Sequence, residues 1–184
     1  MIYEGSIFKG LDKILSKDDL RPTLGVAYID KGSIVATDAH QLVKIDLSFF
    51  GIEKEDADLL EQKCIDLDTI KKLGVLKPSQ KWFINEQGIN VYKANSNKVG
   101  LIYPLEDMQE VGNYPDYNAV IPESPVDQSS FGVNPNFMLN VAKVYEAKEK
   151  DNLKVVLHGK MRAITMRSKC DKFLGLVMPI KIDF

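Results

Sequence analysis

The sequence predicts an α+β fold in which one unit, made of a strand, a helix and three further strands, occurs three times. Two observations indicate this. Runs of β-branched and aromatic residues alternate with short turn signals, which is the pattern of hairpins and largely antiparallel sheets. Each group of strands also follows a segment with apolar residues at three- and four-residue spacing, the pattern of an amphipathic helix that covers one face of a sheet.

The first unit covers residues 1–47, with "MIYEG" as a short leading strand. Residues 5–17 are expected to form a helix, because apolar residues recur on one face, namely Phe8, Leu11, Ile14 and Leu15. Lysines recur every four residues on another face of this helix, at Lys9, Lys13 and Lys17. "LRPTLGVAYIDKGSIVATD" then predicts two strands joined by a turn at Asp-Lys-Gly, and "QLVKIDL" a third strand.

The second unit, residues 63–105, follows an acidic linker at 48–62 that is expected to be a solvated loop or a short helix. "KCIDL" predicts a strand, and "DLDTIKKLGVL" a short helix that Asp66 or Asp68 caps and Gly74 ends. "KWFINEQGINVYKA" predicts a hairpin, and "KVGLIYPL" the last strand.

A second connection, residues 106–128, contains prolines and Gly112, which argue against a helix. The third unit begins with "SSFGV" as a strand, followed by a helix with Asn134 as its cap and Pro135 in its first turn. A hairpin that turns at His158-Gly159-Lys160 and a last strand, "FLGLVMPIKI", complete the unit. We therefore expect one domain at 1–122, containing two units, and a C-terminal half-domain at 123–184.

Composition limits the classes of function. A net charge of −2 over 184 residues argues against a generally basic protein that binds nucleic acid tightly. Cys64 and Cys170 are far apart and form no CxxC pair, so the sequence supports neither a disulfide framework nor a zinc site. No apolar run resembles a signal peptide or a membrane span. We expect a cytoplasmic protein without metal or cofactor.

The segment Thr37-Asp38-Ala39-His40 raises the question of acid–base chemistry, because it gathers three polar residues between two strands. A catalytic centre would also need a nucleophile or metal and a substrate pocket. The other histidine, His158, is expected to be exposed in a turn, and no hydrolase, zinc-protease or phosphate-loop motif occurs. A hydrogen-bonded turn, with or without a role in partner binding, is favoured over an enzyme site.

Three segments resemble signatures of the bacterial DNA sliding clamp, the beta subunit of the replicative polymerase. They are "LRPTLGVAYIDKGSIVATDAHQLVKI", "NYPDYNAVIPESP" and "FLGLVMPIKI", in the order and at the spacing of that family. The helical segment "VNPNFMLNVAKV" also fits, so the resemblance covers nearly the whole chain. It implies a DNA-clamp-like fold and a non-enzymatic processivity or recruitment factor.

The resemblance implies a pocket that accepts short linear peptides of polymerases and repair proteins, anchored by leucine and phenylalanine side chains. Apolar walls with a flexible methionine suit such anchors. The alternative for "LVMPIKI" is an ordinary buried strand, and for many of its residues both interpretations can hold. The residues carried over are Leu24, Thr37, His40, Gln41, Leu42, Pro122, Leu176, Val177, Met178, Pro179 and Ile180.

Three features depart from the family. Ala39 stands where glycine is common, and alanine resists a positive φ, so the turn is expected to differ. Gln41 replaces a common arginine, which removes a charge and a forked donor and is expected to change peptide preference. The chain also extends past the usual end by Asp183 and Phe184, and Phe184 could dock into the pocket.

Duplex DNA is the second expected ligand, because clamps encircle it with lysines on helices that meet phosphates without reading bases. The alternative is that these lysines are ordinary solvated faces. The candidates are Lys9, Lys13, Lys17, Lys71, Lys72, Lys77, Lys143 and Lys148.

Domains of this family contain two units each, so a chain with three units leaves one unit without a partner in its own domain. An unpaired third unit would leave an open sheet edge and an uncovered helix face. Pairing with the third unit of a second chain would complete a domain, and four chains would supply a full ring. The alternatives are that the third unit packs within its own chain, and that the protein is a clamp-derived interaction module or decoy without a ring or DNA.

Overall fold

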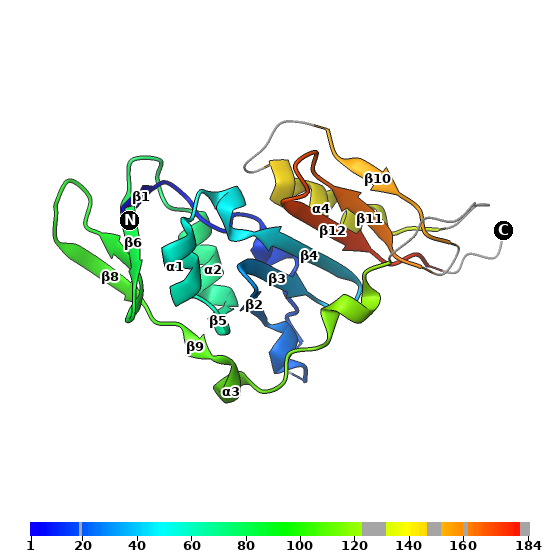
Figure 1. Cartoon of the computed structure of the whole chain (residues 1–184), viewed down its shortest axis with the longest axis horizontal. Helices are drawn as coiled ribbons and strands as arrows, with labels where there is room; N and C mark the ends of the chain where they lie inside the picture. Colours follow the sequence, from blue (N-terminus) through cyan, green and yellow to red (C-terminus); the bar gives the residue numbers. More distant parts are fainter. Residues whose placement is uncertain (19, 123–131, 147–151, 160–161, 181–184) are drawn as a thin grey trace.

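Figure 1 shows a small sheet at one end of the molecule and a large sheet that extends to the other end. The computed structural model describes residues 1–18, 20–122, 132–146, 152–159 and 162–180. The small sheet has the strand order β1 (Tyr3–Glu4), β6 (Lys81–Asn85), β7 (Gly88–Tyr92) and β8 (Val99–Tyr103). The large sheet has the order β10 (Lys154–Val156), β11 (Ile164–Arg167), β12 (Phe173–Val177), β4 (Gln41–Asp46), β3 (Ser33–Thr37), β2 (Val26–Asp30), β5 (Lys63–Asp66) and β9 (Glu106–Asp107).

Short helices join or cover these strands. The α-helices are α1 (Lys54–Leu59), α2 (Leu67–Gly74), α3 (Met108–Val111) and α4 (Pro135–Glu146). The 3₁₀ helices are η1 (Leu11–Lys13), η2 (Pro22–Leu24), η3 (Leu47–Phe50) and η4 (Tyr117–Val120). Among the described residues no helix is long and apolar enough to cross a membrane.

The predicted α+β class with antiparallel sheets is confirmed, since every strand pair in the described residues is antiparallel. The first two units exchange their leading strands: β1 of the first unit pairs with β6 of the second, and β5 of the second pairs with β2 of the first. Trp82 anchors the first exchange, because it stacks on Tyr3 with 4.4 Å between ring centroids and donates to the Gly5 carbonyl at 3.0 Å.

The third unit joins the first within one chain. Strand β12, its last strand, pairs along its whole length with β4, the last strand of the first unit. Helix α4 begins after Asn134, whose carboxamide accepts from the Asn136 N–H at 2.9 Å. Val141 and Val144 of α4 are fully buried against this sheet. The large sheet is therefore continuous across the first and third units. This is the alternative in which the third unit packs within its own chain.

One side of the large sheet carries the main core and the other a smaller one. Alternation along β4 sends Val43 and Ile45 into the main core beneath the helices. Leu42 points the opposite way into a second cluster of buried residues, made of Val35, Leu42, Tyr117, Ala163 and Leu176. Figure 1 shows the connection from α3 through η4 passing along the large sheet to reach the third unit.

The predicted helix at 5–17 is wrong. Only Leu11–Lys13 is helical, as one 3₁₀ turn, because Gly5, Phe8 and Gly10 have φ of 84°, 57° and 92° and each interrupts a right-handed helix. The apolar residues of this segment are still buried, so the spacing identified its inward side but not its conformation.

Three further expectations need correction or fall outside the described residues. The connection at 106–128 does contain a short helix, α3, and the turn η4. His158 is buried rather than exposed, with its Nε2 2.9 Å from the Thr165 hydroxyl. The predicted strand at 129–133 lies mostly outside the described residues; within it Gly132 forms a single bridge with Ile180.

Candidate peptide-binding pocket and lysine-lined hollow

The turn between β3 and β4 is held by its own polar side chains. The Asp38 carboxylate accepts from the backbone N–H groups of His40 and Gln41, both at 2.9 Å. The Thr37 hydroxyl donates to the Gln41 carbonyl at 2.8 Å and accepts from the Ala39 N–H at 3.1 Å. Asp38 and Thr37 are thus occupied in stabilising the turn, which is the structural role expected for them.

Ala39 adopts a φ of 74°, so alanine occupies the left-handed conformation that favours glycine. The hydrogen bonds of Asp38 and Thr37 hold it there. Alanine therefore does not prevent a positive φ at this position, which was the reason to expect a different turn. The conformation costs about 1–2 kcal/mol relative to a residue without a Cβ atom.

Gln41 uses its side chain inside the protein. Its Nε2 donates to the Lys13 carbonyl at 3.1 Å and to the Asp38 carboxylate at 3.0 Å. Its Oε1 is buried and has no hydrogen-bond partner among the described residues. Gln41 is in register with Val177, on the helix-covered face of the sheet, so its side chain ties the turn to η1.

A cavity of about 240 Å³ lies beside this turn, on the face of the sheet opposite α4. Its base is the cross-strand pair Leu42 and Leu176, which are 4% and 2% exposed. Met178 stands at its rim, and the Met178 N–H donates to the His40 carbonyl at 3.1 Å. The cavity thus lies where the first and third units join.

Most of the predicted pocket residues line this cavity, and some do not. Leu24, Thr37, His40, Gln41, Leu42, Leu176 and Met178 line it. Val177 does not, because alternation along β12 buries it in the main core. Pro122 lines a neighbouring shallow hollow that shares Met178, Ala163 and Val120 with the cavity. Pro179 and Ile180 follow the end of β12 and line neither.

The connection between the second and third units supplies a wall that the sequence prediction missed. The Tyr117 hydroxyl donates to the Asp30 carboxylate at 2.6 Å, and its ring lies 5.0 Å below the Lys44 ammonium. Burial and then the Asp30 hydrogen bond raise the pKa of Tyr117, so its hydroxyl stays a donor. This wall belongs to the segment "NYPDYNAVIPESP", which carries part of the family resemblance but from which only Pro122 was predicted as a pocket residue. The missed lining residues are Ala39, Pro115, Asp116, Tyr117, Val120 and Ala163.

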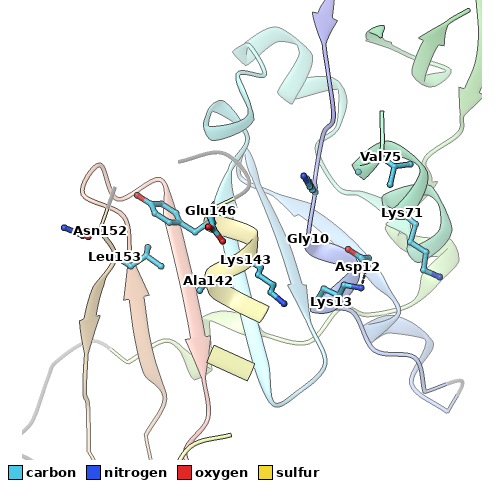
Figure 2. A pocket seen from close by; sticks show the side chains of 13 residues that line it. Gly10, Asp12, Lys13, Lys71, Val75, Ala142, Lys143, Glu146, Asn152 and Leu153 are labelled. Atoms are coloured by element: carbon cyan, nitrogen blue, oxygen red, sulfur yellow. Dashed lines mark ion pairs between the residues drawn. The ribbon is translucent and has the colours of Figure 1, made fainter. Parts of the chain in front are cut away.

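A second, wider hollow of about 1030 Å³ opens between η1, α2 and α4 (Figure 2). Lys13 and Lys143 lie on facing sides of it in this view. Two of its four lysines are already paired: Lys13 with Asp12 at 3.1 Å, and Lys71 with Asp68 at 3.2 Å. No ion pair of Lys9 or Lys143 is found within the described residues.

The hollow gathers only part of the predicted DNA-facing set. Lys9, Lys13, Lys71 and Lys143 line it, whereas Lys17, Lys72 and Lys77 are exposed outside it. Lys148 lies outside the described residues. Asp12 and Glu146 also line the hollow and reduce its positive potential.

Comparison with known proteins links this chain to one fold. No protein-family model and no curated protein matches the sequence. The structure matches the DNA polymerase sliding clamp of Bacillus subtilis with a TM-score of 0.66 and 16% identity, covering 100% of this chain and 64% of that one. It matches a C. crescentus beta sliding clamp with a TM-score of 0.68 and 14% identity, covering 99% and 65%.

The beta subunit of DNA polymerase III from Thermotoga maritima gives the same result, with a TM-score of 0.59, 14% identity and coverage of 100% and 66%. The chain therefore spans about two thirds of the length of the clamps it matches. The polyethylene glycol in the C. crescentus structure is described as bound to a putative beta-motif tethering region. This chain has the fold of the bacterial DNA sliding clamps.

Proposed function

We propose that this protein is a non-enzymatic clamp-like factor of the cytoplasm that recruits replication or repair proteins by binding short linear peptides. The observation that supports this most is the cavity at the β4–β12 join, whose base is Leu42 and Leu176. A buried apolar base with polar groups at the rim suits a leucine or phenylalanine anchor, because desolvating such an anchor supplies most of the binding energy of a peptide.

The role of each side chain follows from its position. Leu24, Leu42, Leu176 and Met178 would contact the apolar anchors, and Met178 can adjust its shape to different ones. His40 would form a side wall, held there by stacking on Phe137 with 5.8 Å between ring centroids. Thr37 and Asp38 fix the turn, and Gln41 fixes it to η1.

Fluorescence anisotropy with a labelled peptide that bears leucine and phenylalanine anchors tests this proposal. Met178→Lys places a charge at the rim of the cavity and should weaken binding by about tenfold or more. Ile180→Lys is the matched control, since Ile180 is 46% exposed in the same segment but lies outside the cavity. The proposal fails if the wild-type protein binds no such peptide, or if both variants lose the same affinity.

We further propose that several copies surround duplex DNA, with the lysine-lined hollow toward the phosphates. Phosphate contacts by lysine give affinity without sequence preference and weaken with salt. Lys9→Glu with Lys143→Glu should therefore reduce both DNA affinity and its salt dependence, measured as the slope of log K against log salt. Lys72→Glu with Lys77→Glu changes the same net charge outside the hollow and should have a smaller effect.

The second candidate function is a clamp-derived interaction module or decoy that binds the same peptides as a single chain and does not bind DNA. The acidic neighbours of the lysines, Asp12 and Glu146, favour it. A mass of one chain in solution at all concentrations, together with peptide binding, would support the decoy over the ring.

A further inference from the structure

Strand β8 is an open and apolar edge of the small sheet. Its neighbour in the described residues is β7 on one side, and no described strand pairs with the other side. Val99, Leu101 and Ile102 are 40%, 55% and 48% exposed, so apolar side chains on both faces of the strand meet water. No residue of β8 is charged.

The other sheet edges of the described structure are protected in the usual ways. Strand β1 has two residues, β9 consists of Glu106 and Asp107, and β10 carries Lys154. Short length and charge both discourage pairing with a second chain. Strand β8 has five residues and no charge. Its ladder with β7 shifts register beside Gly100, and Lys98 and Pro104 flank the strand, so Leu101, Ile102 and Tyr103 form its regular part. A long apolar edge of this kind is expected to be covered.

A comparison of β8 with β12 indicates what covers it. Both are the last strand of their unit, and both carry one pattern: Gly-Leu-Ile-Tyr-Pro at 100–104 and Gly-Leu-Val-Met-Pro at 175–179. In β12 the pattern is buried by pairing with β4, and Leu176 is 2% exposed. Its counterpart in β8, Leu101, is 55% exposed.

Besides the exchange of leading strands between the first two units, the β4–β12 pair shows a second way in which units join in this fold: the last strand of one unit pairs antiparallel with the last strand of another. Strand β8 is the last strand of the second unit, and the last strands of the other two units are already paired with each other. We propose that β8 pairs antiparallel with β8 of a second copy of this chain, about a two-fold axis that makes the contact self-complementary.

The residues of β8 suit this pairing. An axis at Leu101 places this side chain opposite its own copy, Gly100 opposite Ile102, and Val99 opposite Tyr103, each an apolar cross-strand pair or a small residue beside a large one. No like charges meet within the strand. The proposal names one interface of the proposed oligomer and so deepens that part of the proposed function, but it depends on neither peptide nor DNA binding.

Light scattering over a range of concentrations tests the interface. The wild type should have the mass of two chains or a multiple of two, and Leu101→Lys should reduce this mass to about half under the same conditions. Leu20→Lys is the matched control, because Leu20 is 90% exposed and is not part of β8, and it should keep the wild-type mass. Circular dichroism and thermal unfolding verify that both variants are folded.

Two outcomes overturn the proposal: a wild type of one chain at every concentration, or a Leu101→Lys variant with the wild-type mass. In the second outcome the protein is still an oligomer, through another surface, so the proposed assembly stands while the β8 interface fails. Peptide binding is measured separately and is unaffected by either outcome.

Cross-linking gives an independent readout. Leu101→Cys in a Cys170→Ser background should form a covalent dimer with a short bismaleimide, because residues opposite each other in an antiparallel pair have Cβ atoms about 4.5–5.5 Å apart. Val75→Cys in the same background is the control, since Val75 is 80% exposed on the end of α2. Equal cross-linking of the two variants, or none at position 101, contradicts the β8 pair.

Discussion

Leu176 on β12 lies directly opposite Leu42 on β4, so two residues that are far apart in the sequence form the base of one cavity. The pair both holds the third unit to the first and shapes the candidate peptide site. Stability and binding are therefore linked at this position, and a change to either leucine affects both.

Leu42→Ala should lower the free energy of unfolding by about 2–4 kcal/mol, because it removes a buried side chain and leaves a cavity. Urea denaturation measures the loss. Leu139→Ala is the control, since Leu139 is 50% exposed on α4, and it should cost well under half as much. Equal losses would mean that the Leu42–Leu176 contact does not hold the units together.

Ala39→Gly should raise the free energy of unfolding by up to about 1 kcal/mol. Glycine removes the strain of a φ of 74°, and this gain exceeds its larger entropy in the unfolded chain. Ala119→Gly is the matched control. Ala119 is exposed in η4 and has no positive φ, so this substitution should lower the free energy of unfolding instead. Thermal unfolding separates the two, and a loss of stability in both variants would contradict the strain.

Local signals predicted most of the elements, and contacts between distant segments account for what they missed. The turn residues of hairpins and the cap at Asn134 act over a few positions, so "NEQG" and "VNPN" could be recognised directly. The segment at 5–17 failed because positive φ at Phe8 depends on packing that the apolar spacing does not reveal. Leu11 would be buried in a helix and in an irregular loop alike, so the apolar spacing indicated which residues are buried but not that the segment is a helix.

In the candidate site, too, contacts between distant segments account for what the sequence did not predict. The family resemblance identified Leu42 and Leu176 as parts of one site, and their cross-strand contact became visible only in the structure. The wall at Tyr117 was missed because its position depends on a hydrogen bond to Asp30, far earlier in the chain. Likewise, Tyr114 reaches the Val35 carbonyl at 3.3 Å, and nothing in the local sequence of the connection specifies that contact.

Asp66→Ala should destabilise the protein by about 1 kcal/mol at pH 7, because Asp66 caps α2 and accepts from the Asp68 and Thr69 N–H groups at 2.8 and 3.0 Å. Burial raises the pKa of Asp66, but hydrogen bonds with the Thr69 side chain and with the Thr69 and Asp68 N–H groups outweigh it and hold the pKa below its usual value. A lowered folded pKa stabilises the protein above the unfolded value of about 3.9, and this contribution is lost as the pH falls through the folded pKa.

The difference between wild type and Asp66→Ala should accordingly shrink below about pH 4. Asp68→Ala serves as the control: within the described residues the Asp68 carboxylate forms an exposed ion pair with Lys71, so its loss should cost less than Asp66→Ala. Denaturation at pH 7 and pH 3 measures both variants. A difference for Asp66→Ala that stays constant between these pH values would show that the carboxylate is not the stabilising group.

Cys170 should react with iodoacetamide well before Cys64 in the native protein. Cys170 is exposed, and the hydrogen bond between its thiol and the Ser168 hydroxyl, followed by one with a backbone N–H, lowers the pKa of the thiol. Cys64 is 1% exposed, and burial, followed by Glu106, raises the pKa of its thiol to about 11. Because the thiolate is the reactive form, the order of labelling follows both access and charge.

Mass spectrometry of peptides from the native protein, labelled for increasing times at several pH values, determines the order. The Cys170→Ser variant should stay unlabelled until it is unfolded, when Cys64 becomes accessible. Ser168→Ala should move the labelling of Cys170 to higher pH, because it removes the largest cause of the lowered pKa. Labelling of Cys64 at the rate of Cys170 would mean that β5 opens readily from β2 and β9.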